Sequence, residues 1–244
     1  MTADWTATLR RHGRTLLSLA LPPMCPACGD RLGPTDQGVC DECWQHITSP
    51  PGPHCPQCGL GESVIGKKCP GCLPGESHFG AARQAALWQD PIPTMIHRLK
   101  YHGVSELAEP LARLMARVLV HDFPGRRWDV IVPVPLHRVR RRERGYNQSA
   151  LIARELGRML GWSVDERLVL RHRPTLSQTH LSRADRLRNV ANAFHCPEPA
   201  EVEGRRVLLI DDVHTTGSTL NETARALAEA GAVEIFALAV SRAV

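Results

Sequence analysis

Residues 207–219 read Val-Leu-Leu-Ile-Asp-Asp-Val-His-Thr-Thr-Gly-Ser-Thr, and they indicate the class of fold more clearly than any other segment. Its first four residues are apolar, which is typical of a strand buried on both faces of a parallel sheet. Two carboxylates follow, and a loop of small residues then opens into a helix. Because open α/β sheets bind ligands at the carboxyl ends of their strands, the stretch predicts a ligand site as well as a fold.

The loop that follows the carboxylates has the chemistry of a phosphate site. Its backbone N–H groups and hydroxyls can converge on one phosphate at a helix N-terminus, where the helix dipole favours anions. The loop residues are Thr215, Thr216, Gly217, Ser218 and Thr219. Asp211 and Asp212 suit instead the vicinal hydroxyls of a ribose and a Mg²⁺ held mainly by a diphosphate. The structural alternative has solvated aspartates and a capping box between Thr219 and Glu222.

The flanking sequence continues the alternation of strands and helices. Apolar residues recur at helical spacing over 107–119, with Pro110 in a first turn or at a kink, and Asn147 caps a second helix that reaches about residue 160. The expected strands are 129–135, a weaker one at 167–171, 206–213 and 233–240. We therefore expect an α/β fold whose parallel sheet carries helices on both faces. Neither a Walker lysine loop nor a Gly-x-Gly-x-x-Gly motif is present, which argues against nucleoside triphosphate and dinucleotide sites.

Eight of the nine cysteines lie before residue 73, in four Cys-x2-Cys pairs. They are Cys25, Cys28, Cys40, Cys43, Cys55, Cys58, Cys69 and Cys72. Two residues between thiolates let both sulfurs reach one tetrahedral ion, and two pairs close a four-sulfur shell around structural zinc. The Pro-rich segment 48–53 separates the second pair from the third, so we expect the first pair to join the second and the third to join the fourth. A crossed arrangement and a disulfide or redox role are the alternatives.

These patterns divide the chain into three parts. Residues 1–21 are expected to form an amphipathic helix, residues 22–75 a double zinc ribbon and residues 79–244 the α/β domain. The ribbon segment is so poor in apolar side chains that about two Zn²⁺ ions must supply its folding energy, and we expect it to be a separate unit. The apolar run 16–21 is too short for a signal peptide, and no stretch approaches a membrane span of roughly 18 apolar residues. We expect a cytoplasmic protein, since a reducing compartment favours metal over disulfides.

The charge pattern favours anionic ligands. Lys and Arg total 30 against 25 Asp and Glu, a formal +5 that excludes a purely electrostatic nucleic-acid binder. Only three of the 30 are lysines, and arginine binds phosphate with a planar fork, although a GC-rich genome explains the excess more simply. Residues 138–144 hold five arginines, which form either a solvated face or a surface for diphosphate and nucleic-acid phosphates.

The stretch 207–219 resembles the motif that binds 5-phosphoribosyl 1-pyrophosphate (PRPP) in type I phosphoribosyltransferases, and residues 15–240 resemble the ComF family. The segments that carry the second resemblance are Pro22-Pro23-x-Cys25-x2-Cys28, Leu99–Gly103, Pro133–Leu136, Arg144–Gln148, Gln178, Arg186, Asn189 and Phe194. The resemblance implies a zinc-ribbon domain fused to a phosphoribosyltransferase domain. It also implies a link to natural competence and to the handling of incoming DNA.

The resemblance further implies roles for single positions. Asp211 and Asp212 would hold the ribose hydroxyls and residues 215–219 the 5-phosphate. The turn that matches the pyrophosphate loop consists of Pro135, Leu136, His137 and Arg138. Residues 172–194 match a mobile flap, the alternative being a solvated basic loop. The arginines that would meet the diphosphate there are Arg171, Arg173, Arg183, Arg186 and Arg188. His214 stands where relatives usually place an aliphatic or β-branched residue, and we expect it to pack rather than to act in catalysis.

Two functions follow from these patterns. The first is an enzyme that displaces pyrophosphate from C1 of PRPP, with Mg²⁺, and hands the phosphoribosyl group to a nitrogen nucleophile. The second is a non-catalytic module that senses PRPP or a nucleotide and contacts single-stranded DNA or a competence protein through the ribbons and the arginine run. The sequence does not identify an acceptor.

Overall fold

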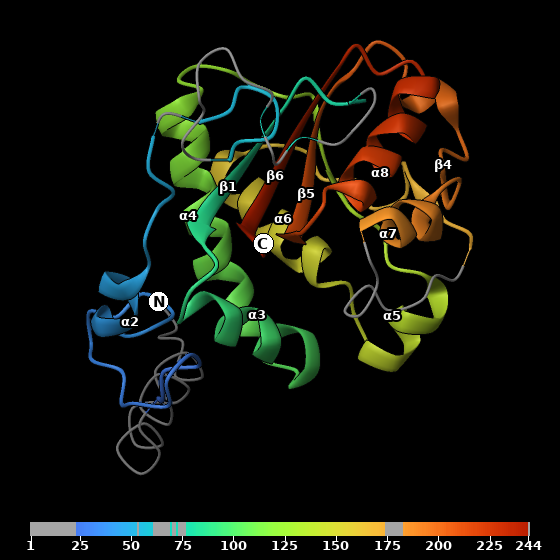
Figure 1. Cartoon of the computed structure of the whole chain (residues 1–244). Helices are drawn as coiled ribbons and strands as arrows, with labels where there is room; N and C mark the ends of the chain where they lie inside the picture. Colours follow the sequence, from blue (N-terminus) through green and yellow to red (C-terminus); the bar gives the residue numbers. More distant parts are fainter. Residues whose placement is uncertain are drawn as a thin grey trace, which may run out of the picture.

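A four-stranded parallel sheet with the strand order β1-β6-β5-β2 lies at the centre of the molecule (Figure 1). Its strands are β1 (Ala81–Leu87), β2 (Val130–Pro133), β5 (Arg206–His214) and β6 (Glu234–Arg242). The structure is a computed structural model that describes residues 23–52, 54–60, 69, 72, 77–173 and 183–243. The expected parallel α/β sheet is confirmed.

Helices cover both faces of this sheet. The helices that the structure describes are α2 (Asp41–His46), α3 (Ile92–Tyr101), α4 (Ala108–Asp122), α5 (Arg138–Arg144), α6 (Gln148–Leu160), α7 (Arg183–Val190) and α8 (Ser218–Glu229), with short 3-10 turns η1 (Ser105–Leu107) and η3 (Pro199–Glu201). α4 and α6 pack on one face and α8 on the other (Figure 1). Within the described ranges, none of these helices has the length and apolarity that a membrane crossing requires.

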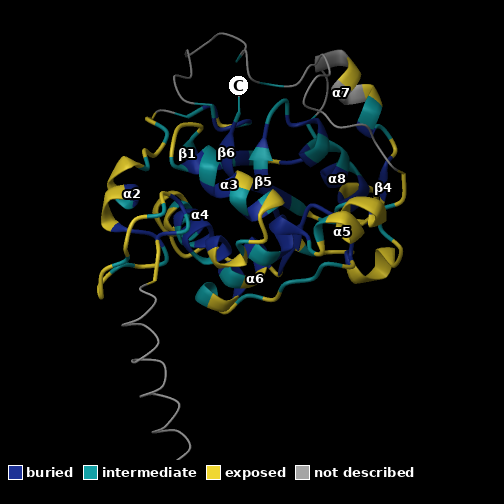
Figure 2. Ribbon diagram, turned by 90° about the horizontal axis from the view of Figure 1, so that it is seen from below, coloured by how far each residue is buried: buried dark blue, intermediate teal, exposed yellow. Residues whose placement is uncertain are grey.

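β5 holds the core together because its side chains alternate between two apolar layers. Leu208 and Ile210 lie in the cluster with α3, α4 and α6. Val207 and Leu209 lie in the cluster with α8. All four are fully buried, and Figure 2 shows the strands as the buried centre between more exposed helices. The run of four apolar residues thus reflects a strand that is covered on both faces.

Two predicted helix starts are confirmed. The Asn147 side chain caps α6 by accepting a hydrogen bond from the backbone N–H of Ser149 at 3.1 Å. Pro110 lies in the first turn of α4, where a missing N–H costs nothing. The alternative of a kink at Pro110 is wrong.

Other expectations need correction. Of the strand predicted at 167–171, only β3 (Leu170–Arg171) forms, and it pairs antiparallel with β4 (Phe194–His195) outside the parallel sheet. β1 was not predicted, because its alanine-rich sequence has weak strand propensity and gains its conformation from pairing with β6. The expected helix 1–21 and part of the expected flap, residues 174–182, lie outside the described residues.

The first ribbon packs on the α/β core instead of standing apart from it. Cys25, Ala27 and Val39 belong to the same buried cluster as α3 and α4. Arg98 on α3 donates a hydrogen bond to the backbone oxygen of Pro26 at 3.2 Å. The expected separate unit is therefore wrong in one respect, since the few apolar side chains of this ribbon find their core in the α/β domain.

The second ribbon lies against the edge strand β1. The backbone N–H of Ala82 donates to the oxygen of Gln57 at 2.8 Å, and Gln84 Nε2 donates to the oxygen of Gly59 at 3.0 Å. Gly59 has a φ of +68°, and a Cβ added there would lie 2.4 Å from the Ala82 oxygen. Gly29 follows the first ribbon's opening Cys-x2-Cys in the same way and has a φ of +88°, but nothing lies within 4 Å of an added Cβ.

We expect Gly59→Ala to destabilise the protein more than Gly29→Ala. Both substitutions force a side chain into the left-handed region, at a cost of about 1–2 kcal/mol. Gly59→Ala also pushes the ribbon away from β1, which costs about 1–3 kcal/mol more. Denaturant unfolding of the zinc-loaded protein measures the difference. Equal losses from the two variants would show that the second ribbon is not held closely by β1.

Candidate functional site

The predicted acidic pair lies at the carboxyl edge of the sheet, inside β5. Asp211 and Asp212 are only 8% and 3% exposed. The alternative in which these aspartates are solvated is therefore wrong. Burial of two neighbouring carboxyl groups requires compensating partners.

Two helices and the strand itself supply those partners. Asp211 Oδ1 accepts hydrogen bonds from Ser149 Oγ on α6 and from the backbone N–H of Asp212, both at 2.9 Å. Asp212 Oδ1 accepts from the backbone N–H of Val213 at 2.8 Å. Asp212 Oδ2 lies 2.5 Å from Lys100 Nζ, at the end of α3. Each acid is thus held by a different helix.

The two acids differ in protonation. Burial raises the pKa of Asp211 to about 8, and repulsion from Asp212 adds to the rise. Burial acts on Asp212 in the same direction, but the attraction of Lys100 outweighs it and lowers the pKa of Asp212. Near neutral pH the pair therefore holds one proton and one negative charge between its two carboxyl groups. Such a pair can donate to and accept from the hydroxyl groups of a ligand.

Residues 215–217 form the turn from β5 into α8, and Ser218 and Thr219 begin the helix, as the sequence predicts. Gly217 is the N-cap residue with a φ of +79°, a conformation that glycine adopts without strain. Thr216 Oγ1 lies 2.8 Å from Ser218 Oγ and accepts from the backbone N–H of Ser218 at 3.4 Å. The alternative capping box is wrong, because α8 begins at Ser218 after the N-cap residue Gly217, so Thr219 lies inside the helix and cannot cap it. The Glu222 carboxylate instead accepts from the backbone N–H of Asn192 at 2.9 Å. Small polar groups therefore surround the N-terminus of a 12-residue helix.

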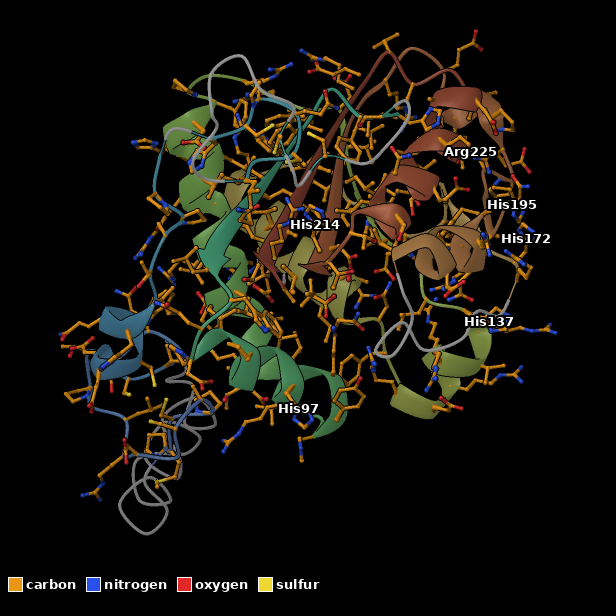
Figure 3. All side chains as sticks on the ribbon, viewed as in Figure 1. His97, His137, His172, His195, His214 and Arg225 are labelled. Carbon is orange, nitrogen blue, oxygen red and sulfur yellow. The ribbon has the colours of Figure 1, made fainter. Side chains whose placement is uncertain are left out.

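The turn 135–138 joins β2 to α5 at the same edge of the sheet. Asn147 Nδ2 donates to the oxygen of Val134 at 3.0 Å and fixes the start of this turn. His137 is buried and caps α5, accepting from the backbone N–H of Val139 at 3.4 Å (Figure 3). Burial lowers the pKa of His137, and the charges of Arg138 and Arg171 lower it further, so the ring is neutral and can accept this bond.

The arginine run after this turn is a helix, which the sequence did not predict. α5 exposes Arg138, Arg140, Arg141 and Arg142, whereas Arg144 is half-buried. Two of the exposed arginines have acidic neighbours, with Arg140 lying 3.2 Å from Glu143 and Arg141 3.9 Å from Glu166. The remaining positive charge makes α5 a basic surface beside the site.

Arg171 on β3 acts electrostatically on Asp211 and on His137 of the turn. Its guanidinium lies 5.3 Å from the centre of the Phe194 ring. Burial lowers the pKa of Arg171 while the charge of Asp211 raises it, and the charge of Arg171 in turn acts on His137. Arg171, one of the flap arginines predicted from the sequence, thus acts on both Asp211 and His137.

A cavity of about 190 Å³ adjoins the acidic pair through Lys100. It is lined by Lys100, Tyr101, Gly103, Arg140, Glu143, Arg144 and Tyr146. The Arg144 guanidinium lies 5.1 Å from the centre of the Tyr101 ring, and the Tyr146 hydroxyl donates to the oxygen of Leu99. Three basic side chains against one acidic side chain make this cavity suitable for an anionic group.

Two residues of the site had not been identified from the sequence. Lys100 lies in the segment Leu99–Gly103, which carries part of the family resemblance, and it is the one lysine after residue 68. Its isolation in an arginine-rich sequence could have identified it. Ser149 had no such signal, because a serine in the first turn of a helix is ordinary. Both reach the acids only through tertiary packing.

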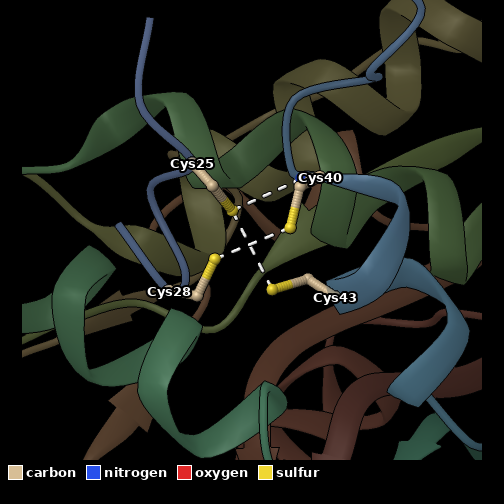
Figure 4. A group of neighbouring side chains, drawn as sticks. All are labelled: Cys25, Cys28, Cys40 and Cys43. Carbon is tan, nitrogen blue, oxygen red and sulfur yellow. Dashed lines mark hydrogen bonds between the residues drawn. The ribbon is translucent and has the colours of Figure 1, made fainter. Parts of the chain in front are cut away.

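The paired cysteines gather in two groups, in the consecutive arrangement. The first group is Cys25, Cys28, Cys40 and Cys43 (Figure 4), and the second is Cys55, Cys58, Cys69 and Cys72. The sulfurs of each group lie within 4.8 Å of one another. The crossed alternative is wrong. Cys196 stands apart from both groups and donates to the Ala226 oxygen at 3.3 Å.

The thiols of the first group fit a tetrahedral zinc ion. Burial would raise the pKa of Cys25, but backbone N–H groups outweigh it and lower that pKa to about 7. Burial and the neighbouring thiols raise the pKa of Cys28 to about 12 and also raise the pKa of Cys43. Four thiols this close can therefore ionise together only around a cation, and a four-sulfur donor set is the preference of structural zinc. The second group repeats the pattern, with the pKa of Cys55 lowered to about 7 and that of Cys72 raised.

We expect metal analysis of the full chain to give about two zinc ions per molecule, because each four-sulfur group closes around one ion. Cys28→Ser should lower the content to about one. Cys196→Ser should leave it unchanged, since that thiol belongs to neither group. A content of one or none in the unaltered protein would contradict the two-site assignment.

We expect Asp211→Asn to stabilise the ligand-free protein by an amount that grows from about pH 5 to about pH 8. A carboxyl group with a pKa of about 8 when folded and about 4 when unfolded binds more protons in the folded state, so stability falls as pH rises through that window. Asparagine does not titrate, so the variant does not lose stability in this way as the pH rises. Thermal unfolding across the pH range measures the effect.

Asp129→Asn is the control for this measurement. Hydrogen bonds from Arg206 lower the pKa of Asp129, so the carboxylate is ionised throughout the window. Its replacement should lower stability without a trend in pH. Parallel profiles for Asp211→Asn and the unaltered protein would contradict the raised pKa.

Comparisons with known proteins agree with this architecture. The double zinc ribbon domain family matches residues 16–73, and the phosphoribosyl transferase domain family matches residues 103–243. The chain is 35% identical to the DNA utilization protein YhgH of Escherichia coli (strain K12), over 89% of this chain and 96% of that protein. It is 33% identical to Competence protein F of Haemophilus influenzae, over 90% and 96%, and 27% identical to Competence protein ComFC of Bacillus subtilis (strain 168), over 80% of each. With a double zinc ribbon, a phosphoribosyl transferase domain and these relatives, the chain belongs to the ComF family.

Proposed function

We propose that this protein binds PRPP with Mg²⁺ at the carboxyl edge of the sheet and is a phosphoribosyltransferase. The observation that carries the proposal is the convergence of three groups at one edge. These groups are a buried acidic pair, a loop of small polar residues at a helix N-terminus, and a turn beside a half-buried arginine. A ligand that consists of a ribose with phosphate groups at both ends requires binding groups of these three kinds.

Each part of PRPP has a counterpart in this arrangement. Residues 215–219 would bind the 5-phosphate through backbone N–H groups and hydroxyls. Asp211 and Asp212 would bind the ribose hydroxyls, with Ser149 and Lys100 holding the two carboxyl groups in place. The turn 135–138 and Arg171 would bind the diphosphate.

The reaction would replace pyrophosphate at C1 of the ribose. The C1–O bond breaks and its electron pair leaves with pyrophosphate, while the lone pair of a nitrogen nucleophile forms the new bond to C1. The sugar becomes cationic in between, so position and charge matter more than a covalent nucleophile. Bound Mg²⁺ would neutralise charge on the diphosphate. Asp212 carries its negative charge beside the ribose, and Arg171 would stabilise the leaving group.

The basic surface of α5 favours a second candidate function. Four exposed arginines lie on this one helix, next to the turn that would bind the diphosphate. In this alternative the protein senses PRPP or a nucleotide without transferring it, and contacts single-stranded DNA or a protein partner through α5 and the ribbons. The names of the relatives, which refer to competence and DNA utilization, support a role in DNA uptake. A cytoplasmic location fits either function, because a reducing compartment keeps the eight thiols available for zinc.

We expect the double variant Asp211→Asn, Asp212→Asn to lose PRPP binding in the presence of Mg²⁺, by at least about a hundredfold, since two buried hydrogen-bonding acids are removed. Titration calorimetry on the full chain measures the loss. Asp129→Asn removes a carboxylate from the residue that precedes β2, at the other end of the sheet, and should bind PRPP normally. Unchanged binding by the double variant would remove both aspartates from the site.

Pyrophosphate release separates the two functions. The full chain is incubated with PRPP, Mg²⁺ and a panel of bases, amines and oligonucleotides. Release that depends on one acceptor identifies a transferase and its substrate. Saturable PRPP binding without release in any mixture, together with oligonucleotide binding, identifies the sensor.

A further inference from the structure

Arg242 ends β6 at the carboxyl edge of the sheet, beside the start of residues 215–219, which we call the phosphate loop. In the sheet register it is the partner of His214 on β5 and of Leu87 on β1. The next backbone N–H, that of Ala243, donates to the His214 oxygen at 3.0 Å. Arg242 is 8% exposed, and a guanidinium so deeply buried needs specific acceptors.

One of its acceptors is a cysteine of the second zinc group. Arg242 Nη1 donates to Cys58 Sγ at 3.5 Å, and Cys58 is itself buried. Four thiolates around one Zn²⁺ carry a net negative charge, so a charged N–H donor to sulfur stabilises the cluster and orients its ligand.

The first zinc group is held differently. Its N–H donors to sulfur include the backbone amides of Asp30 at 3.4 Å and Cys40 at 3.3 Å. The neighbouring arginine, Arg98, donates to the Pro26 backbone oxygen and not to a thiol. The chain therefore contains a matched pair of arginine contacts, one to a cluster sulfur and one to ribbon backbone.

His214 connects Arg242 to the loop. It is 4% exposed, lies at the end of the central strands (Figure 3) and directly precedes Thr215. Burial lowers the pKa of His214 to about 3, and the charge of Arg242 contributes, so the ring stays neutral beside the guanidinium. A shift of Arg242 must be accommodated by this tightly packed neighbour, and hence by the first residue of the loop.

We propose that Arg242 couples the second zinc cluster to the phosphate loop, so that zinc held by Cys58 and its partners and a phosphate held by residues 215–219 stabilise each other. The inference rests on the proposed PRPP site. The route is contiguous, from Cys58 through Arg242 and His214 to Thr215. Because coupling between two binding sites is reciprocal, bound PRPP must slow zinc loss from the second cluster if zinc strengthens PRPP binding.

Zinc release to a chromogenic chelator tests this coupling on the full chain. Cys28→Ser removes the first cluster and so identifies the release phase of the second. We expect PRPP with Mg²⁺ to slow release from the second cluster by at least about fivefold and to leave the first cluster unchanged. Calorimetry on the same samples reports PRPP binding independently. PRPP that binds without slowing this release overturns the coupling and leaves the proposed function standing, whereas absence of PRPP binding overturns both.

Arginine variants test the residue itself. Arg242→Gln should speed zinc release from the second cluster and abolish the protection by PRPP, while Arg242→Lys, which keeps a charged donor, should retain part of it. Arg98→Gln is the matched control and should leave the protection intact. Circular dichroism establishes that each variant is folded. Full protection in a folded Arg242→Gln variant that still binds PRPP would show that Arg242 is not the link.

Discussion

Two adjacent carboxyl groups are buried at the end of β5, and their burial fixes where the neighbouring helices must lie. A buried charge without a partner costs several kcal/mol, so each acid must be compensated within the fold. Lys100 on α3 compensates Asp212, and Ser149 on α6 bonds to Asp211. α3 must therefore end beside the sheet, and α6 must begin there. The positions of two helices and the geometry of the site are parts of one arrangement.

The features that the sequence predicts are the local ones. Residues 207–219 are contiguous, so one pattern contains the strand, the acids and the loop together, and the cysteine spacing likewise predicts both four-sulfur groups. Lys100 and Ser149 escape prediction because only tertiary packing brings them to the acids. β1 escapes because alanines favour a strand weakly, and α5 because a seven-residue helix with no buried side chain has no apolar face to reveal it.

The ribbons show a similar division between spacing and packing. The spacing of the thiols predicts the four Cys-x2-Cys pairs, and the Pro-rich segment 48–53 favours their consecutive arrangement, but neither indicates where the ribbons dock. Docking depends on close contacts with the α/β domain, such as Gly59 against Ala82 and Val39 within the cluster around α3 and α4. Zinc therefore supplies only part of what orders this segment, and burial against the α/β core supplies the rest.

Burial separates the exposed arginines from those that are buried near the site, a distinction that composition alone cannot make. A genome-wide bias adds arginines where they cost least, on exposed surfaces such as that of α5. Arg171 and Arg242 are different, because a desolvated guanidinium is tolerated only where nearby charges and hydrogen-bond acceptors compensate for its lost hydration. Arg171 lies near Asp211, and Arg242 donates to a zinc-cluster sulfur. The arginines that composition explains and those that the site requires are thus distinguished by their surroundings, and the second kind converge on one edge of the sheet.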